Sequence, residues 1–225
     1  MSTGARVLAV VPLNATPQAK SRLRGALDEA GRAELVRWMA ARVLAALSES
    51  GVVARVAVVS PDAAMLAWAA GQGAVPLRQE RGRLNAGLEL GRRWARAEGA
   101  EALLVALGDL PLLRAEEVAA LAALAGVGTT QPSGEYRPGI ALAPDAQETG
   151  TNLLLLRPPE ALPFAFGRAS FPRHVALARV RGIEPAILRA AGARFDVDLP
   201  RDLAELERRV PGAVRCLAEL GGGAR

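Results

Sequence analysis

The chain has 225 residues and is poor in the residue types on which many catalytic and structural sites depend. Its single cysteine, Cys216, excludes an internal disulfide framework and any zinc site built from several cysteines. No pattern of histidine and acid surrounds Cys216, so we expect an inert thiol. The single histidine, His174, excludes a histidine-rich metal centre, and the sequence has no Gly-x-Ser-x-Gly turn for it to serve.

Lysine and aromatic residues are also scarce. Basic residues number 28 against 23 acidic ones, a formal net charge of +5, but the arginines are scattered and aromatic residues make up only 4% of the chain. Nucleic-acid-binding proteins usually concentrate charge on one face and place aromatic rings between the cations. We therefore expect an anionic small substrate and no nucleic acid. The only lysine, Lys20, suggests a position that needs a compact ammonium group.

Long hydrophobic runs are missing as well. The apolar run at 7–11 is too brief for the core of a signal peptide, and no stretch approaches the roughly 20 residues needed to span a bilayer. We therefore expect a cytoplasmic protein with no membrane partner, and we leave a homodimer open.

The distribution of apolar residues favours one α/β domain over residues 1–210, followed by a frayed extension over 211–225. Continuous apolar runs predict buried strands that alternate with helices up to residue 125, a pattern typical of a mostly parallel sheet with helices on both faces. The strands in this part are predicted at 6–13, 52–59, 74–77 and 102–107, and the helices at 28–50, 63–70, 84–97 and 115–125. Beyond it, strands are predicted at 139–143, 152–157, 186–188 and 193–197, with helices at 170–181 and from Pro200 to about 209.

Three polar segments follow predicted strands, where ligands bind on open α/β sheets. Lys20 and Arg22 could bind a polyphosphate or form a solvated turn, and Asp109 could bind a cation or make a turn before Pro111. In the predicted strand 193–197, alternation places Asp196 and Asp198 on one side. Two carboxylates repel each other unless a cation lies between them, so we favour Mg²⁺ there over a helix cap.

Other segments are suited to anions. Ser170 is predicted as the N-cap of a helix, whose free N–H groups can accept a phosphate; Gly167 lets the backbone approach closely. Arg168, Arg173 and His174 add donors, and an ordinary capped helix is the alternative. Hydroxyl groups flank a glycine at 149–151, which could bind phosphate or form a turn, and the segment 82–85 opens another helix.

Taken in order, these segments resemble one family. The resemblance is carried by Val-Pro at 11–12 followed by Ala-Lys-Ser-Arg-Leu, then Gly-x-Leu-Asn, Asp-Leu-Pro-Leu-Leu, Thr-Gly-Thr-Asn, Phe-Gly-x-x-Ser-Phe-x-x-His and Asp-Val-Asp-x-Pro. The chain is similar over about residues 6–207 to the CofC/FbiD guanylyltransferases, which make the activated phospho-acid precursor of the deazaflavin coenzyme F(420).

The resemblance implies a single-domain, Rossmann-like nucleotidyltransferase fold of the GT-A type. It implies transfer of GMP from GTP to the phosphate of phosphoenolpyruvate or 2-phospho-L-lactate, with Mg²⁺ as cofactor and pyrophosphate as the second product. Carried over by position, it assigns the metal to Asp109, Asp196 and Asp198, and the GTP phosphates to Lys20 and Arg22. It assigns the phospho-acid to Thr149, Thr151, Gly167 and Ser170, and the nucleotide also to Pro12, Gly82 and Asn85.

Two departures from the family pattern keep other hypotheses open. Asn14 stands where the family usually has a second lysine, and Arg83 replaces the second glycine of a Gly-Gly pair. The alternatives are a related nucleotidyltransferase that acts on a sugar phosphate or a molybdopterin-type cofactor, and a non-catalytic nucleotide-binding regulator on the same fold.

Overall fold

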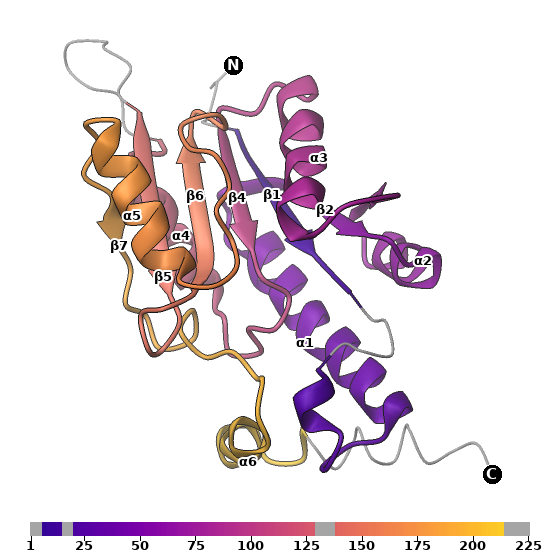
Figure 1. Cartoon of the computed structure of the whole chain (residues 1–225). Helices are drawn as coiled ribbons and strands as arrows, with labels where there is room; N and C mark the ends of the chain where they lie inside the picture. Colours follow the sequence, from indigo (N-terminus) through magenta and orange to yellow (C-terminus); the bar gives the residue numbers. More distant parts are fainter. Residues whose placement is uncertain (1–5, 15–19, 129–137, 214–225) are drawn as a thin grey trace.

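The computed structural model describes residues 6–14, 20–128 and 138–213 (Figure 1). Cys216 and most of the predicted extension over 211–225 lie outside the described residues. In the described part, seven strands form one sheet in which only β6 runs antiparallel to its neighbours. Across the sheet the order is β3 (Val75–Arg78), β2 (Val53–Ser60), β1 (Val7–Pro12), β4 (Ala102–Ala106), β6 (Thr151–Arg157), β5 (Gly139–Pro144) and β7 (Ala186–Ile187).

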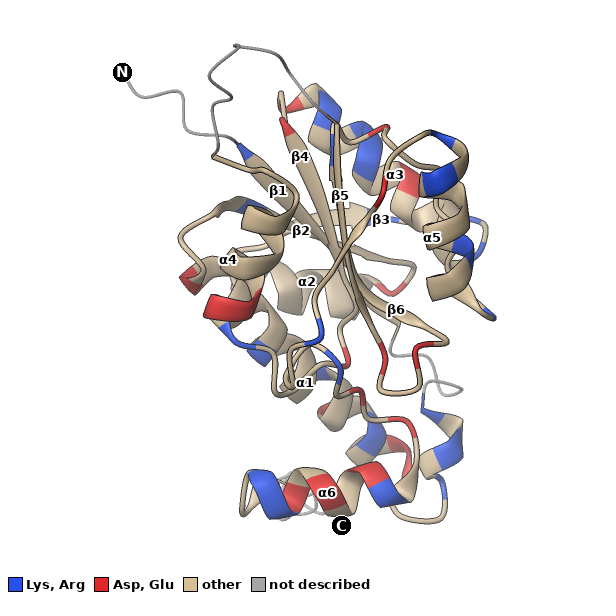
Figure 2. Cartoon of the chain, turned by 90° about the vertical axis from the view of Figure 1, so that its left-hand side faces the viewer, with Lys and Arg blue, Asp and Glu red and all other residues tan. Residues whose placement is uncertain are grey.

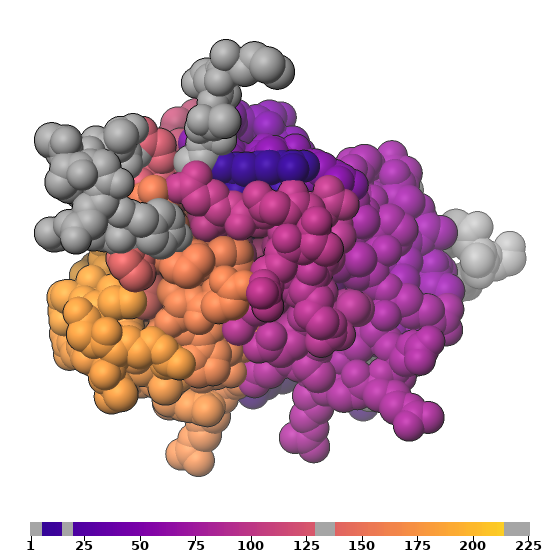
Figure 3. Space-filling model, turned by 90° about the horizontal axis from the view of Figure 1, so that it is seen from above, coloured from indigo at the N-terminus to yellow at the C-terminus, as the bar shows by residue number. Residues whose placement is uncertain are grey.

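Helices cover both faces of the sheet, as predicted. One face is covered by α1 (Glu29–Glu49), α2 (Ala63–Gly71) and α4 (Ala115–Leu124), and the other by α3 (Leu84–Ala97) and α5 (Ser170–Val180). From above, the magenta surface around α3 and the orange surface around α5 adjoin each other (Figure 3). Among the residues described, no helix is both long and apolar enough to cross a bilayer.

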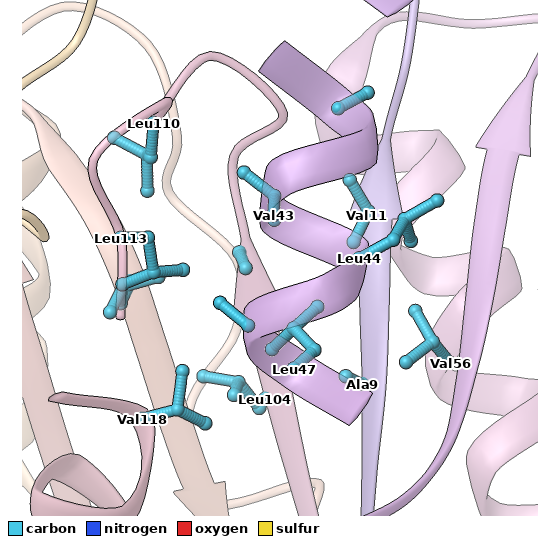
Figure 4. Close-up of a cluster of buried hydrophobic side chains, with 14 of the residues drawn as sticks. Ala9, Val11, Val43, Leu44, Leu47, Val56, Leu104, Leu110, Leu113 and Val118 are labelled. Atoms are coloured by element: carbon cyan, nitrogen blue, oxygen red, sulfur yellow. The ribbon is translucent and has the colours of Figure 1, made fainter. Parts of the chain in front are cut away.

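The two faces have separate cores because successive strand residues point to opposite sides. In β1, Ala9 and Val11 belong to the cluster beneath α1, whereas Leu8 and Val10 belong to the cluster beneath α3 and α5. Figure 4 shows the first cluster, in which side chains of α1 pack against β1, β2, β4 and the segment after β4. Its labelled members are Ala9, Val11, Val43, Leu44, Leu47, Val56, Leu104, Leu110, Leu113 and Val118.

A third cluster lies at the end of the sheet where the parallel strands finish. It joins the short 3-10 helix η1 (Ser21–Leu23) and the first half of α1 to α6 (Pro200–Arg209). Acidic and basic residues are interspersed along α6 (Figure 2). Leu23, Leu35, Met39, Val197 and Leu206 are fully buried in this cluster, which therefore fixes the segments that carry Lys20 and Asp198.

Two predictions of local structure are wrong. Residues 193–197 form turns and irregular backbone rather than a strand. The alternation of side chains that suggested a strand arises because Val197 is buried in the third cluster while its neighbours are partly exposed. Ser170 is the first residue of α5 rather than its N-cap; Ala169 takes the N-cap position in a left-handed conformation.

The direction of β6 places its first residues at the functional edge of the sheet. The carboxyl ends of the other strands meet at this edge, and an antiparallel strand begins where its parallel neighbours finish. Pairing of Leu153 with Ala106 and of Thr151 with Pro144 aligns the start of β6 with the ends of β4 and β5. Thr151 and Asp109 are therefore brought to one edge.

The close approach of α3 to β1 depends on Gly91, because a β-carbon there would lie 2.6 and 2.7 Å from the two γ-carbons of Val10. We expect Gly91→Ala to lower the free energy of unfolding by about 1–3 kcal/mol through overpacking. The measurement is urea unfolding. The control is Gly71→Ala at the end of α2, where nothing lies within 4 Å of the added carbon; equal stability of the two variants would contradict the packing account.

Candidate active site

Lys20 lies between two carboxylates at the edge of the sheet. Its Nζ is 2.7 Å from Asp109 Oδ2 and 2.7 Å from Asp198 Oδ1. The residue precedes η1 with a left-handed backbone, φ 50°, which is uncommon for a residue other than glycine and often marks a functional site. The buried side chain of Leu23 holds η1 against the third cluster. Arg22 extends from the same turn, 70% exposed, with Nη1 3.9 Å from Asp198 Oδ2.

Asp109 follows β4 after a close turn at Gly108. A β-carbon at Gly108 would lie 2.2 Å from Leu13, so the glycine allows this turn to pass directly beside the end of β1. The buried side chains of Leu110 and Leu113 anchor the residues that follow. Asp109 Oδ1 is buried and has no hydrogen-bond partner among the residues described, so this carboxylate can accept another ligand.

Asp196 and Asp198 come from the irregular segment before α6. The N–H of Val197 donates to the carbonyl of Asp109 at 3.3 Å, which joins this segment to the end of β4. Asp202 in the first turn of α6 accepts the N–H groups of Asp198 and Leu199 at 3.0 and 2.7 Å. Leu199, not Asp198, therefore occupies the N-cap position of α6, and the carboxylate of Asp198 is left for Lys20.

The charges at this edge shift two pKa values. Burial, together with the negative charges of Asp109 and Asp198, raises the pKa of Asp196 to about 6. Burial by itself lowers the pKa of Lys20, but the two neighbouring carboxylates outweigh it and hold the pKa above its ordinary value. The site thus combines three acidic groups within electrostatic reach of one another with one fully charged ammonium.

The predicted metal ligands are arranged differently from what the sequence suggested. Across residues 6–14, 20–128 and 138–213, no three acidic, histidine or cysteine side chains gather closely enough to form a metal centre by themselves. The Lys20 ammonium lies between Asp109 and Asp198, where the sequence suggested a cation. Oxygen ligands for a hard cation are nevertheless present, including the unpartnered Asp109 Oδ1.

Three hollows with shared walls follow the edge of the sheet. The first, of about 450 Å³, is lined by Pro12, Lys20 and Asp109 among others. The second, of about 340 Å³, shares Pro12 with it and extends to Gly82. The third, of about 570 Å³, shares Arg22 and Asp198 with the first and includes Thr149 and Asp196. Pro12 and Gly82 therefore border one end of this groove and Thr149 the other, with the three carboxylates between them. Asn85, Thr151, Gly167 and Ser170 line none of these three hollows.

Thr149 and Gly167 are exposed parts of the predicted phospho-acid site. The hydroxyl and N–H of Thr149 donate to the two carboxylate oxygens of Asp145, which orders the loop before β6. Gly167 has φ 122°, a conformation that favours glycine, and accepts the N–H of Ser170.

Thr151 and Ser170 are the buried parts of the same predicted site, 1% and 3% exposed. The N–H of Thr151 donates to Ser170 Oγ at 2.9 Å, so the start of β6 is joined to the start of α5. The expectation that His174 adds a donor to the anion is wrong. Its buried ring is hydrogen-bonded to Thr151 and to the N–H of Ala165.

On the nucleotide side, the structure reveals an organising residue that sequence reasoning missed. The amide nitrogen of Gln79 donates to the carbonyls of Arg81, Gly82 and Arg83, which fixes the loop before α3. Gly82 has φ 93°, again a conformation that favours glycine. The side chain of Asn85 binds both the N–H and the carbonyl of Phe166, so it joins α3 to the segment before α5.

Asn152 is a second residue missed as a site component. Its buried amide donates to the carbonyl of Ala193 at 3.1 Å and to Asp196 Oδ1 at 3.5 Å. It therefore joins the start of β6 to the segment that carries two of the predicted metal ligands. Its place directly after Thr151 in the Thr-Gly-Thr-Asn motif was the available signal.

We expect Asp196→Asn to stabilise the protein at neutral pH. An aspartate whose pKa rises from 3.8 to about 6 on folding holds its proton more tightly in the folded state, so stability falls as pH rises from about 4 through 6. The variant avoids this cost and should gain about 1–2 kcal/mol above pH 6 after allowance for solvent screening, and nothing below about pH 4.

Urea unfolding at several pH values measures this gain. The control is Asp62→Asn at the N-cap of α2, where asparagine caps about as well as aspartate. A gain of equal size in both variants, or one independent of pH, would contradict a cost that arises from the buried negative charge of Asp196.

Comparison with known proteins agrees with this geometry. The family model described as guanylyl transferase CofC like matches residues 7–209. The chain is 48% identical over 201 residues to a phosphoenolpyruvate guanylyltransferase of Rubrobacter xylanophilus, covering 89% of this chain and 93% of that protein. It is 38% identical over 196 residues to a 3-phospho-D-glycerate guanylyltransferase of Phenylobacterium zucineum, covering 84% of each chain.

The fold is shared more widely than the sequence. A crystal structure of a putative nucleotide-diphospho-sugar transferase from Desulfovibrio desulfuricans superposes with a TM-score of 0.71 over 97% of both chains at 16% identity. This likeness establishes a nucleotidyltransferase type of fold. The match over residues 7–209 goes further: the chain belongs to the CofC-like guanylyl transferase family.

Proposed function

We propose that the protein transfers GMP from GTP to the phosphate of phosphoenolpyruvate and releases pyrophosphate, a step toward the deazaflavin coenzyme F(420). The observation that carries this proposal is the Lys20 ammonium between Asp109 and Asp198 at the centre of the groove. Membership of the guanylyl transferase family supports the reaction class, and the name of the Rubrobacter relative supports the acceptor.

The reaction needs positioning more than proton transfer. A phosphate oxygen of the acceptor attacks the α-phosphorus of GTP, the bond from that phosphorus to the bridging oxygen of the β-phosphate breaks, and pyrophosphate leaves with the electron pair. Because the acceptor is already anionic, no general base is required. This agrees with a chain whose only histidine is fully buried. Bringing two polyanions together in line is the main barrier that the protein must lower.

The groove offers a place for each reactant. We assign the nucleoside of GTP to the hollow between Pro12 and Gly82, with Asn85 fixing the neighbouring loop. Lys20 and Arg22 both line the first hollow and would face the GTP phosphates from there. We assign the phospho-acid to the end at which β6 and α5 begin, with contacts from Thr149, Thr151, Gly167 and Ser170.

Asp109 and Asp198 fit a Mg²⁺ site, with Asp196 as a third ligand. Asp109 offers a buried oxygen without a partner among the described residues. The Lys20 ammonium lies beside both carboxylates, so this position already favours a positive charge. A bound Mg²⁺ would neutralise charge on the transferring phosphate and the leaving pyrophosphate. Lys20 can then contribute its charge to the same phosphates, since the two carboxylates would no longer need it.

Residues 1–210 are the proposed catalytic unit, with 211–225 as an extension. Support comes from the family match, which ends at residue 209. It also comes from α6, which packs in the third cluster beside Asp198, although buried Ala213 extends this cluster three residues beyond residue 210.

A panel of acceptors tests the function. The purified protein is incubated with Mg²⁺, either GTP or ATP, and phosphoenolpyruvate, 2-phospho-L-lactate, 3-phospho-D-glycerate or a sugar phosphate, and products are identified by mass spectrometry. We expect guanylylated phosphoenolpyruvate as the main product. A product only from 3-phospho-D-glycerate, the acceptor named for the Phenylobacterium relative, would change the acceptor. GTP binding without pyrophosphate release from any acceptor would instead indicate a regulator.

The carboxylates provide a second test. We expect Asp109→Asn and Asp198→Asn to lower kcat at least about 100-fold, because each removes charge that holds a cation at the phosphates. Asp62→Asn, outside the groove, should retain normal turnover. Circular dichroism verifies that the variants are folded, and unchanged kcat in either site variant would contradict the assignment of these carboxylates.

A further inference from the structure

His174 is the centre of a buried chain of hydrogen bonds. The chain joins the start of β6 to the start of α5, the two segments to which the phospho-acid is assigned. Its Nδ1 lies 2.9 Å from Thr151 Oγ1, and the N–H of Ala165 donates to its Nε2 at 3.0 Å. The N–H of Thr151 donates to Ser170 Oγ. The ring is completely buried.

These contacts determine which ring nitrogen carries the proton. A backbone N–H can only donate, so the Nε2 that faces Ala165 must accept and cannot carry a proton. A neutral ring then has its proton on Nδ1 and donates it to Thr151 Oγ1. Burial, together with the positive charge of Arg173, lowers the pKa of His174 to about 4, so the ring is neutral at ordinary assay pH.

The tautomer in turn decides what Thr151 offers to a ligand. Because Oγ1 accepts from His174, the hydroxyl proton of Thr151 must point elsewhere, and no described residue accepts it. The opposite tautomer would take that proton and leave a lone pair, which repels an anion. The hydroxyl of Ser170 can also donate to a ligand. Its Oγ accepts from the N–H of Thr151, and its own proton has no acceptor among the described residues.

We propose that His174 is a positioning residue for the phospho-acid: by donating from Nδ1 it forces the Thr151 hydroxyl to present a proton, not a lone pair, to the acceptor phosphate. This inference rests on the proposed function for the identity of the ligand. The hydrogen-bond argument itself requires only an anion beside Thr151.

The ring is held in place from the opposite side as well. Phe166 packs against it edge to face, with ring centroids 4.9 Å apart. The side chain of Asn85 binds both polar backbone groups of Phe166, which fixes the backbone next to Ala165. A flip of the imidazole would put a ring carbon in the place of each nitrogen, so the hydrogen bonds with Ala165 and Thr151 would both be lost.

The tautomer can be observed directly because the chain has one histidine. Tag-free protein labelled with ¹⁵N-histidine gives the nitrogen signals of this ring alone. We expect a neutral ring protonated at Nδ1 from about pH 6 to pH 8. A ring protonated at Nε2, or at both nitrogens, would overturn the proposal.

Two substitutions separate the donor from the acceptor. In His174→Asn the amide can take the place of Nδ1 and still donate to Thr151, whereas in His174→Gln it reaches the position of Nε2 and serves only Ala165. Each loses one buried hydrogen bond, so we expect similar decreases in melting temperature. We expect His174→Gln to raise KM for phosphoenolpyruvate about tenfold and to leave KM for GTP nearly unchanged, while His174→Asn retains KM within about threefold. Equal increases in the two variants would indicate a purely structural residue.

A double-mutant cycle tests whether His174 acts through Thr151. Thr151→Val removes the hydroxyl, so adding His174→Gln to it should weaken phosphoenolpyruvate binding no further. If the two substitutions together weaken phosphoenolpyruvate binding by the product of their separate effects, the proposal is overturned.

The same variants distinguish this inference from the proposed function. If wild-type protein turns over no phospho-acid, the function fails. Binding of inorganic phosphate by calorimetry still tests His174: Thr151→Val and His174→Gln should weaken it equally and His174→Asn should not, and any other order, or no binding by wild type, would overturn the inference.

Discussion

One ammonium group placed between two carboxylates organises the functional edge of this molecule. Lys20 is joined to Asp109 and Asp198, residues 89 and 178 positions away in the chain. Removing such charges from water is costly unless each finds a partner, and a lone member of the set would destabilise the fold. Leu23 and Val197 are buried in the third cluster and Leu110 in the cluster beneath α1, so apolar packing anchors each of the three segments that carry the charges.

The architecture was predictable from the sequence because its strands are continuous apolar runs separated by clear breaks. The runs that became β1, β2 and β4 could be buried only in a parallel sheet covered on both faces, and the loops after them could be placed at its carboxyl edge. The segment before α6 was mistaken for a strand because one buried residue, Val197, between two partly exposed aspartates gives the same alternation as a strand. In so short a segment, the sequence cannot show whether an apolar residue is buried by a distant hydrophobic cluster or by pairing of the segment in a sheet.

Contacts between segments were harder to predict from the sequence than the segments themselves. The sequence suggested that Lys20 meets phosphates and that the aspartates meet a cation, but not that they pair with one another. Likewise, His174 was predicted to add a donor for an anion at the start of the helix that contains Ser170. Its partners Thr151 and Ala165 come from other elements, and only the folded chain brings them to the ring. Groups whose roles depend on a partner far away in the sequence require the structure.

In the proposed function, Lys20 competes with a divalent cation for the carboxylates of Asp109 and Asp198. Electron paramagnetic resonance of Mn²⁺ titrated into nucleotide-free protein measures this competition. Lys20→Met should bind Mn²⁺ about tenfold more tightly than wild type, since the two carboxylates lose a competing cation. The added substitution Asp198→Asn should abolish the gain. Unchanged or weaker Mn²⁺ binding by Lys20→Met would contradict the account.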